Sequence, residues 1–337
     1  MIIRIKRGYE KKQLDSLIGL IKTQGLGAEP IVGTEYTVLA VTGDTSVLDI
    51  DRIRAIDIVD GVKRVKEPFK YSGRINREED TIVNDSGVKI GGNAFAFSAG
   101  PCSVESEKQV IEIAEAVKKA GAKILRGGAF KPRTSPYTFQ GIGKEGIEIL
   151  LKAKKEVGLP IVTEITSVKY LDAYSDVDMI QIGARNMQNY DLLKEVGKTG
   201  KPILLKRGFC NTVEEWLMSA EYVMSEGAKN VILCERGIRT FETLTRNTLD
   251  LSSIPLLKEI THLPIIADPS HASGVARAVK PLSLAAVGAG VDGLMIEVHN
   301  DPENALCDGA QSVKPDLFKD IADTVKKVLP IYGKTLG

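Results

Sequence analysis

The sequence predicts an α/β protein in which a (β/α)8 TIM barrel follows a small α+β domain. Two observations lead to this fold class. From Phe95 onward, short apolar segments alternate with amphipathic helical patterns, and eight such apolar segments occur within about 240 residues. An open parallel sheet is the alternative, but open doubly wound sheets usually contain fewer strands. We therefore expect a closed barrel over residues 93–337.

The first domain is expected over residues 1–70. Three strand-like and two helical segments alternate there: 2–6, 37–43 and 62–67 as strands, and 10–24 and a segment from about Val47 as helices. This order is typical of a βαββαβ module. Residues 71–92 are polar and punctuated by glycine, which predicts a linker that carries a hairpin capping the next domain.

The barrel strands are recognised by their nearly continuous apolar character, as expected for parallel strands that are buried on both faces. The eight candidates are 95–101, 123–129, 160–165, 179–184, 202–208, 231–237, 264–271 and 293–300. Helical patterns follow the strands, for example at 107–121, 212–227 and 315–328.

Composition excludes several classes of protein. The formal net charge is +1, so no global field draws the chain to nucleic acid or to a membrane surface. The N-terminus lacks the apolar core of a signal peptide, and no run reaches the roughly 18 apolar residues of a membrane span. Four scattered cysteines without a CxxC pair indicate a reducing compartment. We expect a cytoplasmic protein without nucleic-acid or membrane partners.

Charged residues recur where the predicted strands end, which in a TIM barrel is the side of the active site. The acidic members include Glu164, Glu235 and Asp268. The cationic members are Arg126, Lys131, Arg133, Arg185, Lys206 and Arg236. One such residue is usually a solvated strand end, but a series of them indicates a site, and arginine suits bidentate recognition of phosphate and carboxylate. The substrates are therefore expected to carry several negative charges.

A second group of strand-end residues combines a thiol, an imidazole and two carboxylates. Its members are Cys102, His271, Glu297 and Asp308. Such a mixed set of ligands can hold a divalent transition metal. Spacing alone leaves other interpretations open: Cys102 as a small buried thiol, His271 as a packed core histidine and Asp308 as a loop cap.

The motifs around these residues resemble the 3-deoxy-D-arabino-heptulosonate 7-phosphate (DAHP) synthase family. They are AGPCSVES (99–106), LRGGAFKPRTSPYTFQG (125–141), IQIGARNMQNYDLL (180–193), LLKRG (204–208), ILCERGIRTFE (232–242), ADPSHASG (267–274) and EVHNDPENALCDGAQS (297–312). The resemblance is to the subgroup related to 3-deoxy-manno-octulosonate 8-phosphate (KDO8P) synthase. Some members carry a ferredoxin-like N-terminal regulatory domain, which residues 1–70 fit.

The resemblance implies a reaction and a set of roles. Phosphoenolpyruvate would condense with erythrose 4-phosphate, in the first step of the shikimate pathway, with a divalent metal ion (Mn, Fe, Co or Zn) as cofactor. Cys102, His271, Glu297 and Asp308 match the metal ligands. Arg126, Lys131, Arg185, Lys206 and Arg236 match the residues that hold phosphoenolpyruvate, and Arg133 and Thr134 those that bind the acceptor phosphate. A homotetramer and an aromatic amino acid as inhibitor are also implied.

Catalytic roles are expected for Lys131, Glu164, Glu235 and His271. Lys131 is the first candidate for proton donor to the new hydroxyl, and Glu164 or Glu235 would manage the attacking water. The nearest alternative is a KDO8P synthase that uses arabinose 5-phosphate, which the Lys-Pro-Arg-Thr segment starting at Lys131 disfavours. A non-catalytic phosphosugar-binding regulator is the alternative from another class. For the N-terminal domain, the alternative is a stability or oligomerisation module.

Overall fold

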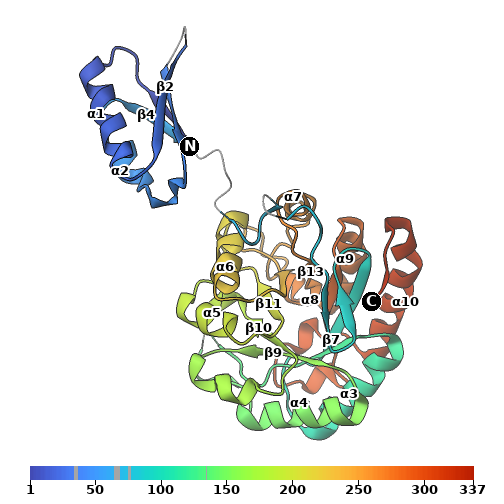
Figure 1. Ribbon diagram of the computed structural model, residues 1–337. Coiled ribbons are helices and arrows are strands. Elements are labelled where there is room, and N and C mark those ends of the chain that lie inside the picture. Colours follow the sequence, from blue (N-terminus) through green and yellow to red (C-terminus); the bar gives the residue numbers. More distant parts are fainter. Residues whose placement is uncertain (34–36, 64–68, 75–76, 134) are drawn as a thin grey trace. The chain divides into compact units, whose positions relative to one another are not determined.

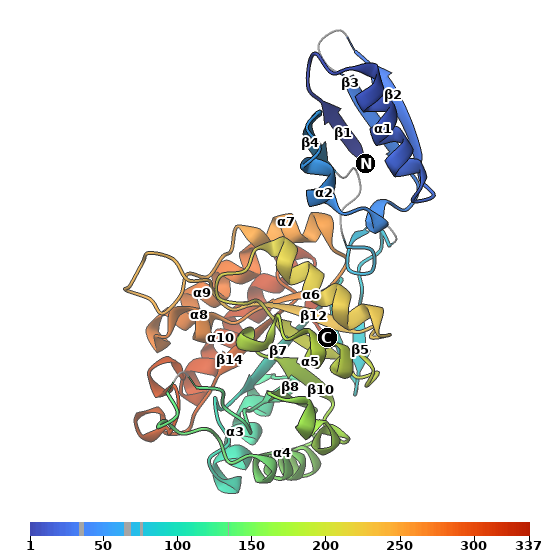
Figure 2. The ribbon, with the colours of Figure 1, turned by 90° about the vertical axis from the view of Figure 1, so that its left-hand side faces the viewer.

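The protein consists of two compact units, Met1–Pro68 and Phe69–Gly337 (Figures 1 and 2). The structure is a computed structural model, and it describes residues 1–33, 37–63, 69–74, 77–133 and 135–337. Within these residues, no helix is long and apolar enough to cross a membrane.

The N-terminal unit is an antiparallel sheet with two helices. Its elements are β1 (Ile2–Ile5), α1 (Lys11–Lys22), β2 (Gly27–Val32), β3 (Thr37–Thr42), α2 (Ile50–Arg54) and β4 (Val59–Lys63), with strand order β2-β3-β1-β4. In α1, Leu14, Leu17 and Ile21 recur at helical spacing and are buried against Ile3 and Leu39 of the sheet. The βαββαβ order predicted from the sequence is therefore present.

Two strands of this unit differ from the periodicity of the sequence. β2 escaped prediction because it is an edge strand in which only Ala28 is buried, so it lacks an alternating apolar pattern. The last strand begins at Val59, earlier than the predicted 62–67, and residues 64–67 of that prediction lie outside the described residues.

The second unit is a closed parallel barrel, which confirms the predicted fold class. Its strands are β7 (Ala94–Gly100), β8 (Ile124–Arg126), β9 (Ile161–Ile165), β10 (Met179–Ile182), β11 (Ile203–Lys206), β12 (Val231–Glu235), β13 (Ile265–Ala267) and β14 (Gly293–Glu297). They pair in this order, and β14 closes the ring against β7, from Gly293 opposite Ala96 to Glu297 opposite Gly100. A Cβ on Gly293 would lie 2.5 Å from the carbonyl oxygen of Ala96, so this close approach of the closing strands requires glycine.

Helices surround the barrel (Figure 1). They are α3 (Glu107–Ala120), α4 (Lys144–Val157), α5 (Tyr190–Gly197), α6 (Val213–Ser225), α7 (Ser253–Ile260), α8 (Pro269–Ser273), α9 (Ala276–Gly288) and α10 (Pro315–Val328). Between β9 and β10 the chain instead forms a 3₁₀ helix, Val168–Tyr174. A 3₁₀ helix rises about 2.0 Å per residue against about 1.5 Å in an α-helix, so this short connection covers more length with few residues.

The amino ends of the barrel strands are closed by a hairpin. β5 (Val83–Asp85) pairs with β6 (Val88–Ile90), and Val83, Val88 and Ile90 pack on apolar side chains inside the barrel. These interior side chains are Ala96, Ile124, Val162, Met179, Leu204, Ile232, Cys234, Ile266 and Met295. A final short strand, β15 (Thr335–Leu336), pairs with the start of β7 at the same end. The hairpin and β15 thus cover the amino ends of the strands, and the polar residues lie at the carboxyl ends.

Candidate active site

An open cavity lies at the carboxyl ends of the strands. Its cationic lining residues are Lys131, Arg133, Arg185, Lys206, Arg236 and Arg246. Glu164, His271 and Asp308 also line it. The barrel thus brings five of the six cations predicted from the sequence into one cavity, together with Arg246, which the sequence reasoning missed.

The four predicted metal ligands converge beside this cavity. Cys102 follows β7, His271 lies in α8, Glu297 ends β14 and Asp308 lies in the loop after β14, yet their ligand atoms all lie within 4.8 Å of one another. The Oε1 atom of Glu297 is 3.1 Å from Nε2 of His271, and Oδ2 of Asp308 is 3.3 Å from Sγ of Cys102. Four polar groups from distant parts of the chain are therefore brought to one point.

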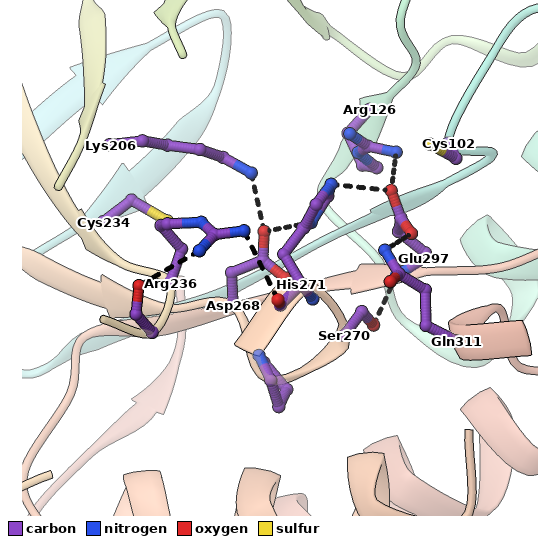
Figure 3. A network of polar contacts seen from close by, with 12 residues as sticks. Cys102, Arg126, Lys206, Cys234, Arg236, Asp268, Ser270, His271, Glu297 and Gln311 are labelled. Carbon is purple, nitrogen blue, oxygen red and sulfur yellow. Dashed lines mark hydrogen bonds and ion pairs between the residues drawn. The ribbon is translucent and has the colours of Figure 1, made fainter. Parts of the chain in front are cut away.

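The orientation of His271 is set by Asp268, which caps α8. The Asp268 carboxylate accepts from the His271 backbone N–H and contacts Nδ1 at 2.6 Å, while Lys206 Nζ donates to the same Oδ2 atom at 2.6 Å. Figure 3 shows this chain of contacts from Lys206 through Asp268 and His271 to Glu297. Burial lowers the pKa of His271 although both carboxylates oppose it. With Nδ1 held by Asp268, the imidazole presents Nε2 to the cluster.

Cys102 is fully buried beside a second thiol and an ammonium group. Its Sγ atom lies 3.3 Å from Sγ of Cys307 and 3.0 Å from Nζ of Lys131. The contact between the thiols, together with burial, raises the pKa of Cys102, and the same contact lowers the pKa of Cys307 to about 7. The two thiols therefore titrate as a coupled pair, in which the loss of a proton from one thiol opposes its loss from the other. Burial opposes the charge on Lys131, but the two sulfurs outweigh it and raise the Lys131 pKa.

The donor set fits a divalent transition metal. It offers a thiol that binds a metal as a soft thiolate, an imidazole nitrogen and two carboxylate oxygens, a combination suited to such ions. Burial opposes ionisation of both carboxyl groups, yet neighbouring charges hold the pKa of Glu297 below its usual range and that of Asp308 at about 2. Among these neighbours, His271 lowers both pKa values the most. Arg126 has the next largest effect on Glu297, and Arg246 on Asp308.

Arg126 ends β8, is almost completely buried, and is not among the residues that line the cavity. Its Nη1 atom donates to the Pro101 carbonyl at 2.6 Å and to Oε1 of Glu297 at 3.1 Å. Among the described residues, its buried Nε has no hydrogen-bond partner. Because an unpaired buried donor is costly, this atom is suited to an anionic oxygen of a ligand.

The ring of Phe209 lies among three arginines. The guanidinium carbons of Arg236, Arg239 and Arg185 are 4.6, 4.9 and 5.3 Å from the ring centroid. Phe209 lines the cavity but was not predicted, because a single phenylalanine after a strand looks like an ordinary core residue. Its position directly after the LLKRG motif was the available signal. The ring stabilises like charges that would otherwise repel one another.

The two glutamates that are candidates to activate the attacking water, Glu164 and Glu235, lie in different surroundings. Glu164 lines the cavity, and its Oε2 accepts from Nε2 of Gln181 at 2.9 Å. Glu235 is fully buried, accepts from Nη1 of Arg207 at 2.9 Å, and is not among the residues that line the cavity. Burial raises the pKa of Glu235, although Arg207 opposes that shift.

Two residues complete the account of the predicted site. Arg133 lines the cavity and donates from Nη1 to Sγ of Cys307 at 3.1 Å, next to the metal-ligand cluster. Thr134 was predicted to bind the acceptor phosphate and lies outside the described residues.

Comparison with known proteins identifies relatives of both units. Residues 77–332 match the DAHP synthetase I family, and residues 1–67 match the DAHP synthase ferredoxin-like domain. The phospho-2-dehydro-3-deoxyheptonate aldolase of Thermotoga maritima is 45% identical over 334 residues, covering 99% of each chain. A 2-dehydro-3-deoxyphosphooctonate aldolase of Geobacter sp. is 36% identical over 276 residues, which cover 75% of this chain and 98% of the relative.

Solved structures agree with these matches. The crystal structure of the Thermotoga maritima phospho-2-dehydro-3-deoxyheptonate aldolase (DAHP synthase) superposes with a TM-score of 0.94 at 44% identity, covering 100% of this chain and 99% of the other. A truncated form of the Thermotoga synthase covers 80% of this chain and 99% of its own, with a TM-score of 0.75 and 46% identity. The chain therefore belongs to the DAHP synthetase I family and carries a DAHP synthase ferredoxin-like domain at its N-terminus.

Proposed function

We propose that this protein condenses phosphoenolpyruvate with D-erythrose 4-phosphate and water, giving 3-deoxy-D-arabino-heptulosonate 7-phosphate and inorganic phosphate. The observation that carries this proposal is the full-length similarity to a heptonate aldolase, since octonate aldolase relatives match only about three quarters of the chain. The reaction would be the first step of the shikimate pathway to aromatic amino acids, in the cytoplasm.

The charge of the cavity supports two anionic substrates. Together they bring one carboxylate and two phosphates, or roughly four to five negative charges near neutral pH. We assign phosphoenolpyruvate to Arg126, Lys131, Arg185, Lys206 and Arg236, and the acceptor phosphate to Arg133 and Thr134. Holding both substrates beside these cations offsets their repulsion and makes their encounter effectively unimolecular.

Cys102, His271, Glu297 and Asp308 would hold a divalent ion, with Mn, Fe, Co and Zn as candidates. When bound, the ion supplies Lewis-acid polarisation of the acceptor aldehyde oxygen. Lys131 lies next to this cluster, with its Nζ atom 3.0 Å from Sγ of Cys102. It is therefore our candidate to donate a proton to the new hydroxyl.

The bond changes can be assigned to these side chains. The methylene carbon of phosphoenolpyruvate forms a bond to the aldehyde carbon, and water adds to the adjacent carbon of phosphoenolpyruvate. We assign removal of the water proton to Glu164, because it lines the cavity and Glu235 does not. Cleavage of the C–O bond in the resulting hemiketal phosphate releases inorganic phosphate, whose charge the arginines stabilise.

The proposal is tested by measuring the loss of phosphoenolpyruvate with erythrose 4-phosphate or arabinose 5-phosphate as acceptor, each with added metal and with a chelator. We expect chelator-sensitive turnover that favours the four-carbon sugar. A preference for the five-carbon sugar would make the protein an octulosonate synthase. Absence of turnover with either sugar would favour a phosphosugar-binding regulator.

We also propose that residues 1–70 sense an aromatic amino acid and that the chain assembles as a homotetramer. Support comes from the match of residues 1–67 to a domain associated with DAHP synthases and from the separate core of this unit. A chain starting at Phe69 keeps the hairpin that packs on the barrel. If tyrosine and phenylalanine inhibit this chain and the full chain equally, the unit is a stability or oligomerisation module instead. Light scattering measures the molar mass of the full chain in solution and so tests the proposed homotetramer.

A further inference from the structure

Both carboxylate ligands of the proposed metal site have one oxygen in the cluster and one bound elsewhere. Glu297 faces His271 with Oε1, while its Oε2 accepts from Nε2 of Gln311 at 2.5 Å. Asp308 faces Cys102 with Oδ2, while its Oδ1 is 3.2 Å from Nη1 of Arg246. In each carboxylate, a neighbouring side chain thus occupies the oxygen that does not face the cluster.

The two supporting side chains also bind each other. Nη1 of Arg246 donates to Oε1 of Gln311 at 3.1 Å. Gln311 is 2% exposed, and its amide is attractive to both partners only with the nitrogen toward Glu297 and the oxygen toward Arg246. Figure 3 shows Gln311 against Glu297 on the side away from His271. The pair therefore connects Glu297 to Asp308 without entering the cluster.

The backbone holds this arrangement in place. Asp308 adopts a left-handed conformation, with φ of +52°, at the start of a short turn, and the Gln311 N–H donates to its carbonyl at 3.3 Å. A ligand and its support are thereby spaced three residues apart. The N–H of Arg246 donates to the Ser273 carbonyl at 2.9 Å, two residues after His271. The supporting pair is thus attached to the segments that carry the ligands.

We propose that Gln311 and Arg246 are positioning residues that act as a pair, holding the outer oxygens of Glu297 and Asp308 so that each carboxylate offers one oxygen to the ion. The inference rests on the proposed metal dependence and assigns no catalytic step to either residue. Arg126 also donates to Oε1 of Glu297 at 3.1 Å, but without the bond to its outer oxygen the carboxylate can rotate about that contact, and the site loses its preorganisation. Loss of an outer partner of a metal ligand typically weakens metal binding by about 10–100-fold.

The test uses the full chain, stripped of metal with a chelator and titrated with Co²⁺. The readouts are the dissociation constant from equilibrium dialysis and the thiolate-to-Co²⁺ charge-transfer absorption. Gln311→Met keeps the length of the side chain but removes both polar contacts, and we expect its Co²⁺ dissociation constant to rise about 10–100-fold. Arg246→Met should weaken binding as well, and the double variant should lose little more than the worse single variant.

A matched control is Gln109→Met, because Gln109 is also a buried glutamine but contacts His299 and the Ser103 carbonyl rather than a ligand carboxylate. Its Co²⁺ affinity should stay within about twofold of the parent. Thermal unfolding of the metal-free variants shows that each is folded before titration.

Unchanged Co²⁺ affinity and absorption in Gln311→Met would reject the positioning role. Losses that multiply in the double variant would show that the two residues act separately and would reject the pair. Failure of the unchanged chain to bind Co²⁺ would reject the metal proposal itself, which separates that result from the other two.

Discussion

The two ends of the barrel use the same strands for opposite purposes. At the amino ends, the interior holds apolar side chains such as Ile124, Ile232 and Met295, closed by a hairpin. At the carboxyl ends, the interior holds buried charges such as Arg126 and Asp268. Burying charges costs free energy unless they are paired or bind a ligand, whereas burying apolar surface is favourable. The amino end therefore stabilises the fold, whereas the buried charges of the carboxyl end lower its stability and are suited to binding and chemistry.

The sharpest test of this comparison changes the carboxyl end. We expect Lys131→Met to lower kcat by about 10²- to 10⁴-fold, because the variant removes the proposed proton donor. Any fall in its unfolding temperature should be smaller than the fall caused by a cavity in the apolar core, because burial opposes the charge on Lys131 and offsets part of the attraction of the two sulfurs. Steady-state kinetics and thermal unfolding check the two expectations, with the exposed Lys152→Met as control. A variant that is destabilised but retains kcat would reverse the comparison.

At the amino end, Ile232→Ala should have the opposite effect. Ile232 is fully buried among the interior side chains, so a cavity at this position should cost about 2–5 kcal/mol in the free energy of unfolding. kcat of the folded enzyme should remain unchanged. Denaturant unfolding measures the first quantity, with Ile31→Ala on the exposed edge strand as control. A large loss of kcat without loss of stability would contradict the division of roles.

A smaller effect is expected at Phe209, whose ring lies among three arginines that repel one another at the carboxyl end of the barrel. Phe209→Leu keeps apolar volume but removes the ring face beside three arginines, an interaction of roughly 0.5–2 kcal/mol. We expect the KM for phosphoenolpyruvate to rise by about 2- to 30-fold with little change in kcat. The exposed Phe241→Leu is the control. An unchanged KM would show that the arginines hold their positions without the ring.

The smallest effect concerns the segment that leads into the hairpin. Asp80 is partly exposed and its burial raises its pKa, but Arg74, 2.5 Å away, outweighs this and lowers the pKa below 3.8. The stabilisation from a lowered pKa is present above the unfolded value and disappears as pH falls through the folded value. Asp80→Asn should cost less than about 1 kcal/mol at pH 7, and the difference should disappear once acid protonates Asp80 in the folded chain. Urea unfolding at pH 7 and in acid measures it, and a difference that persists in acid would exclude the ion pair as its cause.

Prediction from the sequence succeeded where a local pattern is repeated and failed where a contact joins distant segments. The eight apolar barrel segments were recognisable because each is buried on both faces. The edge strand β2 was missed because burial of Ala28 alone leaves no pattern. Glu164 and Glu235 were equivalent in sequence, since both end a strand, and only packing against Gln181 or Arg207 separates them.

The sequence by itself determined the alternation of strands and helices, the cationic character of the strand ends and the four residue types of the candidate metal site. Only the tertiary structure decided which atoms meet. The contact of His271 with Glu297, the three arginines around Phe209, and the support of Glu297 by Gln311 depend on side chains from different segments of the chain. The physical reason is that hydrophobic periodicity is local, whereas the geometry of a buried polar site is set by chain segments that closure of the barrel brings together.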